Sequence, residues 1–110
     1  MESAFYRYYH ISTDYIESAW DTREIETYLM NTGCFINEGK GSYKFTKTFM
    51  SLQLMMVKDY NSWSSNDYNS SKTNYIDIVT AKNVEPVVVQ FFQEFEMFIG
   101  GHVIEETHEN

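Results

Sequence analysis

The residue types best suited to binding a metal ion gather near the C-terminal end of the chain, at His102, Glu106 and His108. On a β-strand these positions share one face, because side chains alternate between the two faces. A zinc site, however, needs three or four convergent ligands that further hydrogen bonds hold in place. This segment lies at the chain end, so we expect a solvated acidic tail and predict no metal site.

Single residues and short motifs give no stronger sign of catalysis. Cys34 is the only cysteine, which excludes an intrachain disulfide, and its neighbours Gly33 and Phe35 indicate a helix end followed by core. The stretch GKGS at 39–42 lacks the spacing of a phosphate-binding P-loop and predicts a turn. No two carboxylates stand out as an acid–base pair. We therefore predict that the protein is not an enzyme and carries no cofactor.

Charge is the strongest compositional signal. Sixteen acidic residues face eight basic ones, which gives a net charge of −8. Nucleic-acid affinity rests largely on lysine and arginine displacing counterions, so direct nucleic-acid binding is disfavoured. A basic protein partner is favoured instead, because opposite charges raise encounter rates. The alternative is that the acidity only keeps a small protein in solution.

Part of this acidity follows a regular spacing. Asp14, Glu17, Asp21 and Glu24 are separated by three, four and three residues. On one continuous helix they would form a negative stripe about 15 Å long at 1.5 Å per residue. If the helix restarts at Asp21, the stripe breaks and two of the acids act as helix caps. A solvated helix face is the simpler interpretation of either arrangement.

Residues 59–71, DYNSWSSNDYNSS, place large aromatic rings among polar residues. Tyrosine, tryptophan, serine and asparagine are the residues enriched in antibody binding loops, and Trp and Tyr are common interface anchors. We therefore predict a partner-binding surface there, formed by Tyr60, Trp63 and Tyr68 with Asp59 and Asp67. The alternative is that Trp63 folds back to cover a sheet edge.

The hydrophobic pattern predicts one domain over residues 1–110. It indicates a strand at 3–11, a helix that begins near Thr13 or Asp14 and ends at Gly33, strands at 43–57 and 75–81, a helix from Pro86 to Gly100, and a closing strand at 102–106. Residues 34–37 fit a short strand or an extended entry. Residues 49–57 also fit a helix, although strand is preferred. Residues 59–74 would be the loop of a long hairpin, and 107–110 a frayed tail.

This succession predicts an α+β fold of order βαββαβ, the ferredoxin-like split βαβ arrangement with two helices on one face of an antiparallel sheet. The N-terminal stretch lacks the order of a secretory signal, and the apolar runs are too short to span a membrane. We therefore expect a cytoplasmic protein without membrane contact.

Small size, acidity and surface aromatic residues are the profile of immunity proteins, antitoxins and phage-encoded inhibitors of host defence. The sequence thus favours an inhibitor that neutralises a basic protein target, either a nuclease toxin or a nucleic-acid-binding defence protein. Its contact residues would be the aromatic residues and aspartates of 59–68 together with Asp14, Glu17, Asp21 and Glu24. The alternative is a homodimer or larger homo-oligomer of a ferredoxin-like module that binds a small ligand between protomers.

Overall fold

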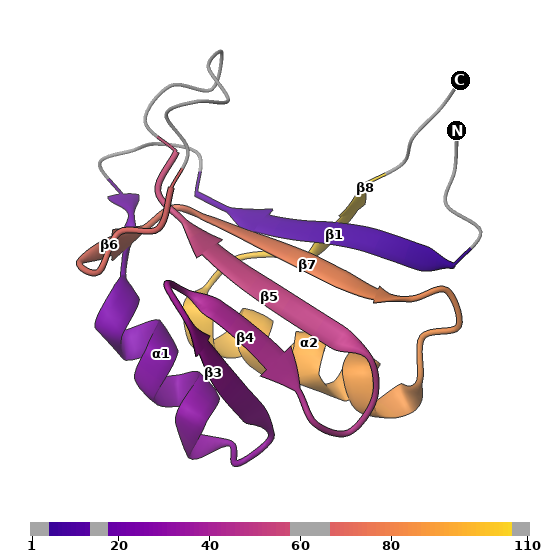
Figure 1. Cartoon of the computed structure of the whole chain (residues 1–110). Helices are drawn as coiled ribbons and strands as arrows, with labels where there is room; N and C mark the ends of the chain where they lie inside the picture. The colour runs from indigo at the N-terminus through magenta and orange to yellow at the C-terminus, as the bar shows by residue number, and fades with distance from the viewer. Residues whose placement is uncertain (1–4, 14–17, 58–66, 107–110) are drawn as a thin grey trace.

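The computed structural model describes residues 5–13, 18–57 and 67–106. Within these residues the chain forms, in order, β1 (Tyr6–Ser12), β2 (Trp20–Asp21), α1 (Thr22–Asn31), β3 (Phe35–Gly39), β4 (Ser42–Phe45), β5 (Met50–Met55), β6 (Lys72–Thr73), β7 (Tyr75–Ala81), α2 (Pro86–Ile99) and β8 (Ile104–Glu106). Six strands form one antiparallel sheet in the order β3-β4-β5-β7-β1-β8 (Figure 1). β2 and β6 pair in a small second sheet.

The main sheet is apolar on one face only. Along β7, Ile76, Ile78 and Thr80 are buried while their neighbours are partly exposed, and β5 shows the same alternation. Successive strand residues point to opposite faces, so these buried positions all lie on one side. Both helices cover that side, and their apolar residues join the sheet in a single core (Figure 1). Neither α1 nor α2, the helices of the described residues, covers the other face of the sheet.

The two helices have different start signals. The Asp21 carboxylate accepts hydrogen bonds from the backbone N–H groups of Arg23 and Glu24, which makes it the N-cap of α1. α2 begins with Pro86 and ends at Gly100, whose φ of 76° lies in the left-handed region that glycine adopts without strain. Neither helix is long and apolar enough to span a membrane in the part of the chain that the structure describes.

The prediction of one α+β domain with a largely antiparallel sheet and two helices is confirmed, whereas the βαββαβ order is not matched. The predicted strand at 43–57 is two strands, β4 and β5, separated by a bend at 46–49. Residues 34–37 contribute to β3, an edge strand joined to β4 by a tight turn. Gly39, Lys40 and Gly41 all have positive φ there, so the turn closes a hairpin that widens the sheet. Within residues 49–57, Met50–Met55 form β5, so the preferred strand is found and the alternative helix is not.

The segment predicted as a hairpin loop is partly ordered by pairing. Asp67 forms a β-bridge with Met56, and Lys72–Thr73 is β6. Asn74 is fully buried and bonds to both the N–H and the C=O of Val57 through its side chain. A buried amide with both of its groups satisfied fixes the register between the end of β5 and the start of β7.

The side chain of Phe95 tests the core directly, because it is fully buried at the centre of α2 and contacts Phe91 and Tyr28. Phe95→Ala should lower the free energy of unfolding by about 3–5 kcal/mol through lost burial and a cavity. Met97→Ala, on the opposite side of the same helix with 86% of its residue exposed, should change it by less than about 0.5 kcal/mol. Urea unfolding of both variants measures the difference. Equal effects would contradict this packing.

Candidate functional site

Five of the nine predicted partner-binding residues, Asp14, Glu17, Asp59, Tyr60 and Trp63, lie outside the described residues. The structure therefore neither supports nor opposes their predicted role. The other four, Asp21, Glu24, Asp67 and Tyr68, are described. They fall on two neighbouring segments, the start of α1 and the stretch that follows the β-bridge to Met56.

The position at which α1 begins shows whether the predicted acidic residues can share one continuous helix. The helix begins at Thr22 and Trp20–Asp21 is a strand, so Asp21 caps the helix and does not lie within it. Its carboxylate is held by the two backbone N–H groups at 2.8 and 3.3 Å. Glu24 lies in the first turn of α1, where a negative charge is favoured by the helix dipole, and its side chain is exposed. Glu24 is thus an exposed acid of the predicted set, as is Asp67.

Tyr68 contacts the body of the domain. Its ring lies so close over Gly41 that a Cβ atom added there would be 2.4 Å from Tyr68 Cδ1. Its side chain is half-buried against the core. Asp67, one residue earlier, accepts a hydrogen bond from the Tyr68 backbone N–H at 2.7 Å. These contacts fix the position of Tyr68 against the domain and leave its side chain only partly accessible.

Glu26 holds three segments together. Its carboxylate accepts a hydrogen bond of 2.7 Å from the hydroxyl of Tyr43 on β4 and one of 3.3 Å from the hydroxyl of Tyr68. Burial raises the pKa of Tyr43 far above its ordinary value, and the bond to Glu26 raises it further. Burial also raises the pKa of Tyr68, with the charge of Glu26 as the second cause. Both phenols therefore stay protonated and donate to a charged carboxylate.

Two open hollows lie beside α1. The aromatic hollow, between α1 and α2, has a volume of about 390 Å³ and is lined by Arg23, Glu24, Thr27, Tyr28, Asn31 and Phe98. The rings of Tyr28 and Phe98 stack there at 4.2 Å with an angle of 14°. The second, here called the Glu26 hollow, has about 400 Å³ and lies toward β3 and β4, lined among others by Glu26, Met30, Asn37 and Tyr43. Both volumes are of the size that accepts one large side chain or a small ligand.

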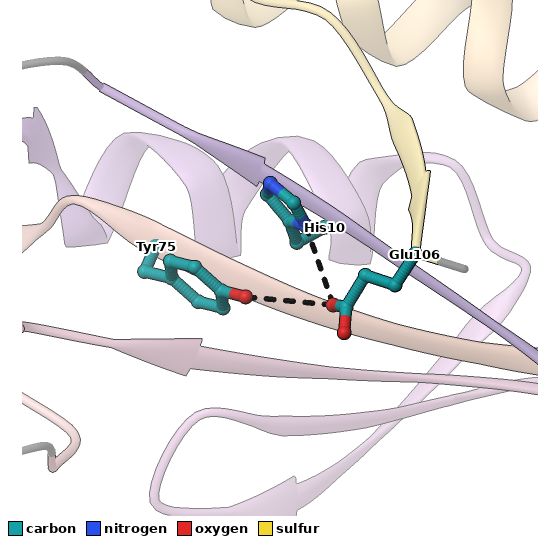
Figure 2. A network of polar contacts seen from close by, with 3 residues as sticks. All are labelled: His10, Tyr75 and Glu106. Atoms are coloured by element: carbon teal, nitrogen blue, oxygen red, sulfur yellow. Dashed lines mark hydrogen bonds and ion pairs between the residues drawn. The ribbon is translucent and has the colours of Figure 1, made fainter. Parts of the chain in front are cut away.

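The open face of the sheet carries a polar cluster from three neighbouring strands (Figure 2). Glu106 Oε2 on β8 lies 3.3 Å from His10 Nδ1 on β1 and accepts a hydrogen bond of 3.4 Å from the Tyr75 hydroxyl on β7. The His10 and Tyr75 rings stack at 5.2 Å. Burial raises the pKa of Tyr75 to about 12, and the charge of Glu106 is the next cause.

Asp77 lies directly across from His10 in the pairing of β1 with β7. Its carboxylate accepts no hydrogen bond from the described residues, and partial burial raises its pKa, with repulsion from Glu106 next and attraction to His10 opposing. None of the hollows beside the helices reaches this cluster among the described residues. It is a polar patch that ties β8 to β1 and β7.

Sequence reasoning missed His10, Tyr75 and Glu26. It paired Glu106 with nearby histidines, but His102 is exposed before β8 and His108 lies outside the described residues. No group of three metal-ligating side chains occurs in the ranges that the structure describes. In β1 of the structure, His10 points to the face of the sheet opposite that of the buried Tyr9 and Ile11. What was lacking was the pairing of β1 with β8, which joins residues 96 positions apart.

The Tyr75 pKa tests the polar cluster. Tyr75 should titrate at about 12, and Glu106→Gln should lower this pKa part of the way toward 10.0, since burial, the larger cause, remains. The raised pKa means that the folded state favours the neutral phenol. Its contribution to stability is therefore complete below pH 10 and falls as the pH rises through about 12. Carbon NMR of labelled tyrosine rings measures the pKa, with Tyr75→Phe to assign the signal. An unchanged pKa in Glu106→Gln would contradict the contact.

Comparison with known proteins gives no relative to argue from. No protein-family model matches the sequence, and the searches of curated proteins and of solved structures return no match. Function must therefore be inferred from the side chains that this fold brings together.

Proposed function

We propose that the chain is a small acidic binding protein, not an enzyme, that neutralises a basic protein target by covering its functional surface. The supporting observation is that few of the carboxylates that the structure describes form ion pairs within the chain. Apart from Glu105 and Glu106, the acidic residues in the described part of the chain have no basic side chain within ion-pair distance. Such uncompensated negative charge attracts a positively charged partner and speeds their encounter.

The target class follows from this charge. Proteins that cut or bind nucleic acids present lysine and arginine to phosphate, and carboxylates can occupy the same groups. We propose a nuclease toxin or a nucleic-acid-binding defence protein as the target, met in the cytoplasm, with the chain acting as an immunity protein, an antitoxin or a phage inhibitor. Among the described acids of the predicted set, Asp21, Glu24 and Asp67 are all exposed, and the Asp21 carboxylate also caps α1.

Inhibition assays test this function. The full chain is titrated into basic nuclease domains and, as the control, into nuclease domains of neutral or acidic charge, at low and high salt. We expect stoichiometric inhibition of a basic domain and an association rate that falls steeply with salt, because exposed charges are screened beyond roughly 10 Å at 0.1 M. Absence of inhibition at low salt, or inhibition that ignores salt, would argue against the proposal.

Trp63 is the predicted anchor of the contact. Trp63→Ala should weaken binding to such a target by on the order of 2 kcal/mol and leave the fold intact, since interface tryptophans often dominate binding energy. Calorimetric titration gives the affinity, and urea unfolding of the same sample gives the stability. A variant that loses its fold but keeps its affinity per folded molecule would show that Trp63 is a core residue.

The alternative is a homo-oligomeric ferredoxin-like module that binds a small ligand between protomers. Six of the elements, β1, α1, β5, β7, α2 and β8, support this alternative because they come in the expected sequence along the chain, although β2, β3, β4 and β6 lie between them. The outer side of α2 supports self-association, because Val89, Met97 and Phe98 are 44%, 86% and 42% exposed. A large exposed apolar side chain of this kind is typical of interfaces.

Met97→Glu separates the two functions. In a homodimer formed through α2, burying a glutamate at the interface should shift the chain to a monomer. In the inhibitor, the same change should leave both the mass and the inhibition of a basic target nearly unchanged. Light scattering after size exclusion measures the mass, with Lys82→Glu as a surface-charge control away from α2. A wild-type chain that is monomeric at every concentration would rule out the alternative.

A further inference from the structure

The two hollows lie on opposite flanks of α1. Arg23, Thr27 and Asn31, at intervals of four residues, line both hollows and so form the outward ridge between them. Glu24 lines only the aromatic hollow and Glu26 only the Glu26 hollow. At about 100° per residue, these two carboxylates point roughly 200° apart around the helix axis. The ridge therefore has one acid on each side.

The aromatic hollow fits the side chain of an arginine or lysine. The stacked rings of Tyr28 and Phe98 give an apolar wall for the aliphatic stem, and an aromatic face attracts a cation. Glu24 stands at the α1 side of this hollow. Glu94 of α2 lies near enough to Tyr28 that its charge, after burial, raises the pKa of that tyrosine. An incoming cation thus meets the Glu24 carboxylate and an aromatic ring inside the hollow, while Glu94 lines the neighbouring hollow along α2.

The Glu26 hollow offers the same combination with different residues. Met30, 46% exposed, supplies the apolar surface. The Glu26 carboxylate already accepts hydrogen bonds from the hydroxyls of Tyr43 and Tyr68, which fix its position. A carboxylate has about four acceptor sites, so Glu26 retains capacity for a guanidinium group. A charged acceptor held in place in this way loses little freedom when a partner binds.

We propose that α1 is the recognition element for the basic partner and that two cationic side chains of the partner, arginines by preference, enter the hollows on either side of Thr27. This proposal rests on the proposed function and specifies its surface. A helix with side chains is about 10–12 Å wide, so the two cationic groups must be about 10 Å apart. The planar guanidinium suits both the aromatic wall and a carboxylate better than an ammonium group does. Arg23 on the ridge is the one charge there that opposes the partner.

A designed peptide tests the spacing. The probe is an alanine-based helical peptide with two arginines seven residues apart, which places them about 10.5 Å apart on one face. One control peptide has the arginines two residues apart, on opposite faces, and another replaces both with neutral citrulline. Each is titrated into the full ¹⁵N-labelled chain at low salt. We expect backbone amide shifts at residues 23–31 and 98, with affinity about tenfold higher for the seven-residue spacing than for either control.

Variants of the chain distinguish specific binding of the peptide at the two hollows from nonspecific electrostatic attraction to the acidic protein. Glu24→Gln and Glu26→Gln should each weaken the probe about threefold, and glutamine keeps an acceptor oxygen for the phenols at position 26. Arg23→Gln should strengthen the probe about two- to threefold, a gain that loss of structure would not produce. Glu85→Gln makes the same change of net charge at the N-terminus of α2, away from both hollows, and should alter affinity less than twofold.

The possible outcomes test the α1 binding surface and the proposed inhibitor function separately. Shifts on α1, dependence on spacing and the gain from Arg23→Gln together support the proposal. If the peptide moves the amides around Asp77 and Glu106 instead, or if Glu85→Gln matters as much as Glu24→Gln, then the α1 surface is wrong while a basic partner stands. If neither the peptide nor any basic nuclease domain binds at low salt, both proposals fail.

Discussion

The buried apolar side chains of β1, β5 and β7 point to one side of the sheet, and α1 and α2 cover that side and remove it from water. A one-residue slip in any of these strands would turn Ile11, Leu52 or Ile78 to the open face, so burial fixes the register. The register then decides the polar contacts: His10 comes to lie opposite Asp77 and beside Glu106 because Tyr9 and Ile11 are buried on the other face. The polar cluster is therefore a consequence of core packing.

The same constraint determines where α1 can act. Ile25 and Leu29 bury one side of the helix, and its remaining circumference is divided by what packs on each flank, α2 on one and the β3–β4 hairpin on the other. Glu26 fastens the hairpin side by accepting from Tyr43 and Tyr68. Such donors compensate for the hydration that a half-buried carboxylate loses. The extra hairpin, which departs from the predicted order, thus also creates the second hollow.

Local sequence patterns were sufficient to predict the structural features that depend on residues close together in the chain. α2 runs from its proline to its glycine, and β7 follows from the alternation in YIDIVTA. The spacing of Asp21 and Glu24 allowed a restart at Asp21 as one alternative, whereas the helix start predicted near Thr13 or Asp14 was wrong, because α1 begins at Thr22. Contacts between residues far apart in the sequence could not be predicted. Nothing near Glu106 points to His10, and nothing near Tyr68 points to Gly41 or Glu26. Of the predicted site, Glu24 could be foreseen as an exposed acid, whereas Tyr28, Glu26 and Phe98 join it only through the packing of α1 against α2 and β4.

The net charge treats all carboxylates as equivalent, but in the folded chain they differ in the contacts that they make. Asp21 caps a helix, Glu85 accepts from Thr48, Glu96 accepts from the Val103 N–H, and Glu105 pairs with Arg7, so these charges already have partners inside the chain. A carboxylate that already has such donors gains less from a new cation than a solvated one does, because part of its charge is compensated. The net charge therefore overstates the surface open to a basic protein. The acids that combine exposure or spare acceptor sites with an adjoining apolar wall lie along α1, and a charge next to an apolar wall can hold both the head and the stem of an arginine.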